Sequence, residues 1–286
     1  MPPLTNSASE TAPEHPFELA NLQVRRGDFQ TVLFDFDGTI SLIRQGWREI
    51  MIPMMVEIIA DIGTDESTDE LSEKVADFVD LLTGQQTIYQ ILRLCEEVRQ
   101  RGGRPRDPLV YKTLYHDRLL THIDDRISKL ESGEAQPHEW MVTGIVDLLQ
   151  NLQGLGLQLV LASGTDIQYV KREAELLGVT SFFGDSIFGA LDEYKDFSKA
   201  MVIQNILKRR QIRGESLLGF GDGYVEIENV KSVGGTAVGV ASDEERREGV
   251  DAWKRDRLLQ AGADIIIPEY TEQASLVSFL IDASAA

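Results

Sequence analysis

Residues 31–39 read Thr-Val-Leu-Phe-Asp-Phe-Asp-Gly-Thr, an apolar run that ends in two aspartates separated by one residue. The run Thr31–Phe34 predicts a buried strand, which places Asp35 at the carboxyl end of the strand, where α/β sheets bind ligands. Two neighbouring carboxylates resist joint ionisation unless a cation joins them. The stretch therefore predicts a site for a hard, oxygen-liganded cation such as Mg²⁺, with one carboxylate left to attack an electrophile.

The same stretch has two other interpretations, a calcium loop and a plain turn. A calcium loop that starts at Asp35 needs a third acid at its fifth position and Glu at its twelfth, but these positions hold Thr39 and Gly46. The EF-hand interpretation therefore fails. A plain strand-end turn, with Gly38 at positive φ and solvated acids, stays open from this stretch alone.

A second apolar run, Leu157–Ala162, ends in Ser163-Gly164-Thr165 and precedes a helical pattern. A hydroxyl and free main-chain N–H groups before a helix form a cradle for an anion, although a simple helix cap has the same sequence. Lys199, 36 residues after Ser163, begins another helical pattern. It is a candidate cation for the same anion, and a solvated surface lysine is the alternative.

A third apolar run, Ser216–Gly221, leads into Asp222-Gly-Tyr-Val-Glu226. These two acids at a strand end are suited to completing a metal site. The glycines around Phe220 do not have the G-x-G-x-x-G spacing of a dinucleotide-binding loop. The motif therefore favours metal binding over dinucleotide binding.

The order Asp-x-Asp-Gly-Thr, Ser-Gly-Thr, Lys and Gly-Asp-Gly-x-x-Glu resembles the haloacid dehalogenase (HAD) superfamily of phosphohydrolases, over residues 31–39 and 139–242. The 23-residue spacing from Lys199 to Asp222 is similar to that of phosphoserine-phosphatase-type and phosphoglycolate-phosphatase-type members. The resemblance implies that Asp35 is the nucleophile and Asp37 the general acid/base. It further implies phosphate binding by Ser163, Gly164 and Lys199, and a metal site of Asp35, Asp37, Asp222 and Glu226.

The resemblance implies a Mg²⁺-dependent phosphatase that hydrolyses a small phosphorylated metabolite through an aspartyl-phosphate. Asp37 would protonate the leaving alkoxide and then activate water. Dehalogenase members lack this second aspartate, so its presence favours phosphoryl transfer. One departure is that Glu226 stands where many members carry Asp. The alternatives are a phosphomutase of the same superfamily and a non-catalytic binding protein on the same fold.

Asp35 and Ser163 are 128 residues apart, far more than a strand-to-strand crossover needs, so a subdomain must be inserted between them. Apolar positions at helical spacing recur over residues 71–82, 88–98 and 120–130. This pattern predicts an all-helical insertion over residues 44–138, which resembles the C1-type cap of HAD enzymes.

The fold class predicted is α/β, with a Rossmann-like core and a parallel sheet built from residues 27–43 and 139–286, and residues 1–26 as a disordered tail and lead-in. The expected elements after the insertion are strand 157–162, helix 166–177, helix 197–210, strand 216–221, helix 224–232, strand 236–240, helix 252–261, strand 264–267 and helix 271–281.

Substrate choice is expected to depend on polar residues of the insertion. The candidates to face the cleft are Arg44, Gln45, Trp47, Gln85, Gln86, Arg104, Arg106 and Lys112. For each of them a solvated or packed side chain is the alternative. Together they suggest a small hydrophilic organophosphate such as a sugar phosphate.

Composition narrows the partners. The chain carries 28 basic and 47 acidic residues, a net charge of −19, which disfavours nucleic acid and anionic membranes as partners. The single cysteine, Cys95, lies on an apolar helical stripe, which indicates a buried thiol. The N-terminal residues lack the pattern of a signal peptide, and no apolar stretch has membrane length. A cytoplasmic monomer or homodimer is expected.

Overall fold

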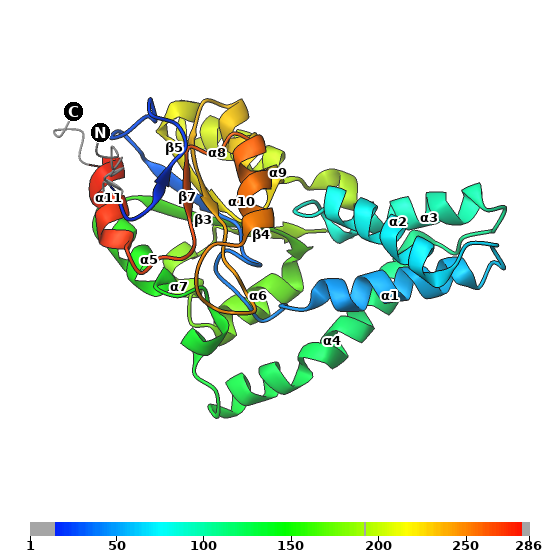
Figure 1. Ribbon diagram of the computed structural model, residues 1–286. Helices are drawn as coiled ribbons and strands as arrows, with labels where there is room; N and C mark the ends of the chain where they lie inside the picture. The colour runs from blue at the N-terminus through cyan, green and yellow to red at the C-terminus, as the bar shows by residue number, and fades with distance from the viewer. Residues whose placement is uncertain (1–14, 192, 282–286) are drawn as a thin grey trace, which may run out of the picture.

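A computed structural model describes residues 15–191 and 193–281 of the chain. Its centre is a seven-stranded sheet with the strand order β1-β7-β6-β5-β2-β3-β4 (Figure 1). All neighbouring strands are parallel except β1, which pairs antiparallel with β7. The strands are β1 (Glu18–Leu19), β2 (Thr31–Phe34), β3 (Gln158–Asp166), β4 (Ile187–Ala190), β5 (Leu217–Gly221), β6 (Thr236–Val240) and β7 (Ile265–Ile267). The predicted α/β class with a parallel sheet is confirmed.

Helices cover both faces of the sheet because its strands are apolar on both sides. In β2, Val32 and Phe34 belong to one buried cluster, whereas Leu33 belongs to the other. The first cluster includes residues of α5 (Ile145–Gly154), α6 (Ile167–Leu176), α7 (Thr180–Phe183) and α11 (Gln273–Ile281). The second includes residues of α8 (Lys199–Arg210), α9 (Tyr224–Ser232) and α10 (Ala252–Gln260).

The insertion between β2 and α5 forms only helices, as the apolar spacing predicts. Its α-helices are α1 (Trp47–Ala60), α2 (Thr68–Leu81), α3 (Thr87–Gln100) and α4 (Pro108–Ser132), which we call the helical segment. A short 3-10 helix, Pro137–Trp140, follows them. Figure 1 shows that α1, α2 and α3 project to one side of the sheet and that α4 runs back along them. Capping fixes two of the starts: Ser67 and Glu70 form a capping box at α2, and Asp107 caps α4 ahead of Pro108.

The two connections between the helical segment and the sheet lie side by side. The Leu42 N–H donates to the Trp140 carbonyl at 2.8 Å, and the Val142 N–H donates to the Ile40 carbonyl at 3.0 Å. These contacts lie near Ser41–Arg44 and Pro137, where the sequence predicts the junctions. The exact limits of a domain over residues 44–138 stay a prediction.

Helix α1 contains Pro53, which reads as an interruption in the sequence but is accommodated inside the helix.

Two short strands are absent from the sequence-based prediction. Strands β1 and β4 have two and four residues, too short for a periodic signal. The predicted disordered tail lies, up to residue 14, outside the described residues, and the His15 ring stacks on Phe17 with centroids 5.0 Å apart.

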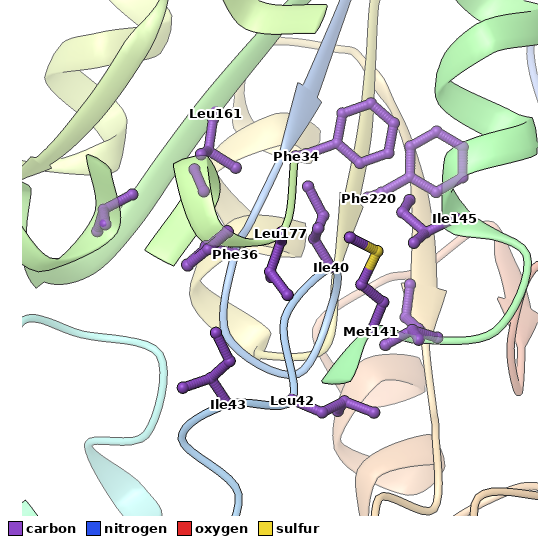
Figure 2. Close-up of a cluster of buried hydrophobic side chains, with 14 of the residues drawn as sticks. Phe34, Phe36, Ile40, Leu42, Ile43, Met141, Ile145, Leu161, Leu177 and Phe220 are labelled. Atoms are coloured by element: carbon purple, nitrogen blue, oxygen red, sulfur yellow. The ribbon is translucent and has the colours of Figure 1, made fainter. Parts of the chain in front are cut away.

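The sheet core continues directly beneath the Asp-Phe-Asp loop. Figure 2 shows the buried side chains, and the rings of Phe34 and Phe220 stack with centroids 4.9 Å apart. Phe36, between the two aspartates, is fully buried in the same cluster. Because Phe36 points into the core, the residues on either side of it, Asp35 and Asp37, point the other way, toward the pocket. The buried ring therefore anchors the loop that carries the two acids.

Two expectations from composition concern the described residues. Cys95 is buried, as its apolar stripe predicts. Among residues 15–191 and 193–281, none of the helices has the length and apolarity needed to cross a bilayer.

Candidate active site

A pocket lies beyond the carboxyl ends of β2, β3 and β5, and Asp35 is at its base. The Asp35 N–H donates to the Phe220 carbonyl at 3.0 Å, which continues the pairing of β2 with β5 by one residue. One carboxylate oxygen of Asp35 is 2.9 Å from the Lys199 ammonium. The buried acid is therefore held by the backbone on one side and by a cation on the other.

The charge of Asp35 is only partly compensated. Burial raises the pKa of Asp35 to about 6, although Lys199 opposes this shift. The carboxylates of Asp222 and Asp37 raise the pKa further. An additional cation among these three acids would restore the ionised form that nucleophilic attack requires.

Asp37 is oriented by hydroxyl groups. Its Oδ2 accepts hydrogen bonds from Thr165 Oγ1 at 2.8 Å and from Ser163 Oγ at 3.2 Å. Its Oδ1 is 3.8 Å from the Arg44 guanidinium and has no hydrogen-bond partner among the described residues. Asp37 is therefore fixed in position by its Oδ2, while its Oδ1 is buried beside the Arg44 guanidinium.

Ser163, Gly164 and Thr165 form the last part of β3, which extends past the predicted end at residue 162, and they lie against the helical segment. The Thr165 N–H donates to Ser163 Oγ at 3.0 Å, so the hydroxyl also organises this stretch. A Cβ on Gly164 would lie 2.8 Å from the main-chain oxygen of Gln85, in the connection between α2 and α3. Only glycine permits this approach, which closes the pocket from the side of the helical segment.

Lys199 is buried at the start of α8, where the Ser198 side chain caps the helix. Its ammonium contacts both Asp35 and Glu226. The sequence interpretation assigned Glu226 to the metal, but the structure places its Oε1 against Lys199 and leaves its Oε2 buried without a hydrogen-bond partner in the described part of the chain. Glu226 in this arrangement orients the lysine.

Asp222 packs directly against the first loop. A Cβ on Gly38, which has φ +74°, would lie 2.1 Å from Asp222 Oδ2. The Asp222 N–H donates to Thr39 Oγ1 at 3.0 Å. Gly38 and Thr39 therefore bring the third predicted acid close to Asp35.

Lys254 and Glu244 complete this side of the site and were missed by the sequence analysis. The Lys254 ammonium is 2.9 Å from Asp222 Oδ2 and 2.6 Å from Glu244 Oε1. Burial alone would lower the pKa of Lys254, but the two carboxylates raise it above its ordinary value. The sequence around Lys254 reads only as a charged helix face, because its partners lie in other segments.

The candidates in the helical segment divide into two groups. Arg44, Gln45, Trp47 and Gln85 line the pocket, as expected. The other four do not, and the expectation that they face the cleft is wrong for Gln86, Lys112, Arg104 and Arg106.

Each of the four has a different position. The Gln86 side chain donates to the Phe197 carbonyl at 2.7 Å, and Lys112 forms a buried ion pair with Asp166 at 2.6 Å. Arg104 and Arg106 are exposed in the loop between α3 and α4. Residues that the sequence analysis missed stand in their place: Met51, Thr83, Thr87, Gln90 and Tyr115 line the pocket.

The oxygen ligands at this site suit a hard cation that takes few of its ligands from the protein. The described residues hold no group of three or more Asp, Glu, His or Cys side chains arranged around one point. Asp35 and Asp222 do lie within each other's electrostatic influence, since Asp222 raises the pKa of Asp35. Two carboxylates and a main-chain oxygen are sufficient for Mg²⁺, which keeps several of its waters in proteins.

A sequence model of the haloacid dehalogenase-like hydrolase family matches residues 29–234. The match includes strands β2 to β5, the helical segment and every residue of the site except Lys254 and Glu244. The chain therefore belongs to the haloacid dehalogenase-like hydrolases. A search of curated proteins gave no match.

Solved structures with the same fold support this assignment. A predicted phosphatase from Clostridium acetobutylicum has a TM-score of 0.57 at 18% identity, covering 88% of this chain and 99% of its own. A predicted phosphoglycolate phosphatase from Haemophilus somnus has a TM-score of 0.56 at 13% identity, covering 87% and 98%. β-Phosphoglucomutase from Clostridium difficile has a TM-score of 0.54 at 15% identity, covering 81% and 98%. At identities this low, the similarity shows that the fold is shared and no more.

Proposed function

We propose that the protein is a Mg²⁺-dependent phosphatase that hydrolyses a small phosphate monoester through an aspartyl-phosphate on Asp35. The observation that carries the proposal is the pairing of buried Asp35 with Lys199 at 2.9 Å, beside Asp37 on its hydroxyl partners. A carboxylate nucleophile, a cation and a second acid are the groups that stepwise phosphoryl transfer requires.

Asp35 attacks the phosphorus, and the bond from phosphorus to the alcohol oxygen breaks. Lys199 neutralises charge on the phosphoryl oxygens, with Glu226 holding the ammonium in place. In the substrate complex the Ser163 hydroxyl would turn its proton from Asp37 to the same oxygens, beside the main-chain N–H of Gly164. These groups compensate the repulsion between the carboxylate and the dianionic ester.

Asp37 transfers the protons of both steps. In the first step its protonated carboxyl gives a proton to the leaving alkoxide. In the second step the carboxylate takes a proton from the water that hydrolyses the aspartyl-phosphate. Thr165 donates a hydrogen bond to Oδ2, which keeps the carboxyl in position for both steps.

The residues that would hold Mg²⁺ are Asp35, Asp222 and the main-chain carbonyl of Asp37, with Lys254 and Glu244 fixing the Asp222 carboxylate. The ion supplies positive charge at the phosphoryl group when it is bound. Gly38 keeps the two carboxylates close enough to share it.

Residues 44–138 act in this proposal as a cap over the pocket. The approach of Gln85 to Gly164 and the hydrogen bond from Gln85 Nε2 to the Tyr224 hydroxyl at 2.8 Å both join the α2–α3 connection to the sheet domain. A closed cap excludes bulk water from the reaction.

The test is phosphate release from p-nitrophenyl phosphate and from a panel of small phosphate esters, with Mg²⁺ and with excess chelator. We expect turnover with Mg²⁺ and its loss in chelator. Unchanged turnover in chelator would disprove the metal requirement, and transfer of phosphate to a second position of the substrate without release would indicate a mutase.

A further inference from the structure

We infer that the alcohol part of the substrate carries hydroxyl groups and no negative charge, so that phosphate esters with a carboxylate on the alcohol are poor substrates. The inference rests on the proposed phosphatase function and specifies its substrate class.

The first observation is the chemistry of the pocket wall that the helical segment provides. Every residue of this segment beyond Arg44 that lines the pocket is uncharged. The wall includes Gln45, Trp47, Met51, Thr87, Gln90 and Tyr115. The part of the substrate that extends away from Asp35 toward this wall therefore finds amide, hydroxyl and apolar groups.

The second observation is that the cations near the pocket are already paired. Arg44 contacts Glu173 at 2.7 Å, and Lys199 contacts Asp35 and Glu226. Lys254 lies between Asp222 and Glu244, and Lys112 pairs with Asp166. Recognition of a carboxylate normally uses a cation or a bidentate guanidinium, and none of these four is free to provide it.

The surplus charge of the site has the same sign as a carboxylate. The four cations face seven carboxylates, of which Asp35, Asp37, Asp222 and Glu244 line the pocket. One Mg²⁺ and the phosphate dianion cancel each other in net charge. A substrate carboxylate would therefore enter an acidic pocket without a counter-ion, which is the arrangement that rejects a ligand.

The third observation is the supply of unused hydrogen-bonding groups. The side chains of Gln45, Thr87 and Tyr115 line the pocket and make no side-chain hydrogen bonds to other residues within the described ranges. Trp47 and Met51 add apolar surface beside them. A polyol presents hydroxyls to the first group and C–H faces to the second.

The size of the cavity limits this alcohol. Its volume is about 110 Å³. A single water needs only about 10–15 Å³ by this measure, so the space admits a ligand of several heavy atoms. A phosphoryl group with a short polyol is a ligand of this kind.

The experiment compares kcat/KM for glycerol 3-phosphate and 3-phosphoglycerate, which share three carbons and the phosphate position but differ in a hydroxymethyl or a carboxylate group. p-Nitrophenyl phosphate reports the chemistry alone. We expect the kcat/KM of glycerol 3-phosphate to exceed that of 3-phosphoglycerate at least about tenfold. An equal or greater kcat/KM for 3-phosphoglycerate overturns the inference.

The aryl ester separates the two ways to fail. If p-nitrophenyl phosphate is hydrolysed and 3-phosphoglycerate is preferred, the inference is wrong and the proposed function stands. If no ester is hydrolysed with Mg²⁺ present, the proposed function is wrong and the inference falls with it.

A variant locates the effect in the pocket wall. Gln45→Arg places a cation without a built-in carboxylate partner beside the alcohol, and we expect the preference for glycerol 3-phosphate over 3-phosphoglycerate to fall at least about fivefold. Gln100→Arg, at an exposed position of α3, is the matched control and should leave the ratio unchanged. An unchanged ratio in Gln45→Arg would overturn the placement of the alcohol against this wall.

Discussion

The two walls of the pocket differ in how their polar groups are satisfied. On the sheet side, acids and cations are buried and bind one another, as in the pairs Asp35–Lys199 and Asp222–Lys254. On the side of the helical segment, Gln45, Trp47 and Tyr115 are uncharged. The first arrangement suits a reaction common to all phosphate esters, and the second suits the choice among them.

The largest effect is expected from a substitution on the sheet side of the pocket, at the proposed nucleophile Asp35. Asp35→Asn removes the nucleophile at almost constant volume, so turnover of every phosphate ester should fall by at least about 10³-fold. Phosphate release and a thermal melt followed by circular dichroism measure activity and folding together. Asp185→Asn, at an exposed position, is the control and should keep full activity. Substantial activity in Asp35→Asn would refute the aspartyl-phosphate mechanism.

Asp37 sharpens the comparison within the sheet wall. Asp37→Asn cannot donate a proton, so kcat should fall about 10²- to 10⁴-fold for alkyl phosphates and much less for p-nitrophenyl phosphate, whose leaving group needs no proton. The measurement is kcat against the pKa of the leaving alcohol. Equal losses for aryl and alkyl esters would show that Asp37 is not the general acid.

The sheet wall could be predicted from the sequence because its residues follow apolar strands. Asp35, Ser163 and Asp222 each come directly after such a run, and parallel strands bring their ends to one edge. The same apolar runs predict β2, β3, β5, β6 and β7 along the chain, but neither β4 nor the order of the strands in the sheet.

The other wall could not be predicted, since helix periodicity shows which face is buried but not what that face meets. Lys112 is buried like a pocket residue, yet its partner is Asp166 of the sheet domain. Tyr115, one turn further along α4, lines the pocket and looks like a core aromatic in the sequence. Lys254 joins Asp222 from a helix 32 residues later, a contact that only the tertiary structure creates.

The contact between the walls provides a third test. Lys112→Met leaves Asp166 buried with no ammonium beside it, which should lower the free energy of unfolding by about 3–5 kcal/mol. Lys129→Met in the same helix breaks an exposed pair with Asp125 and should leave the free energy of unfolding almost unchanged. Urea unfolding of the two variants makes the comparison. Similar small losses would show that the Lys112 pair does not stabilise the association of the walls.

The smallest expected effect concerns His116, which lies in α4 with its Nδ1 3.7 Å from Asp166 Oδ2. Burial lowers the pKa of His116 to about 4, helped by Arg44 and Lys112 and opposed by Asp166. The unfolded chain, where histidine has a pKa near 6.5, then binds more protons between these two values. Stability from the neutral ring is therefore complete above about pH 6.5 and is lost as the pH falls toward 4.

Urea unfolding of the wild type and of His116→Asn between pH 4.5 and 7.5 isolates this contribution, because the carboxylates titrate in both proteins. The difference in unfolding free energy between them should shrink as the pH falls, and by at most about 1.4 kcal/mol per pH unit. Thr121→Asn, at an exposed position of the same helix, exchanges no titrating group and should give a difference that does not vary with pH. A pH-independent difference for His116→Asn as well would mean that the wall contact tolerates a protonated ring, and that charge is not excluded from this part of the helical segment.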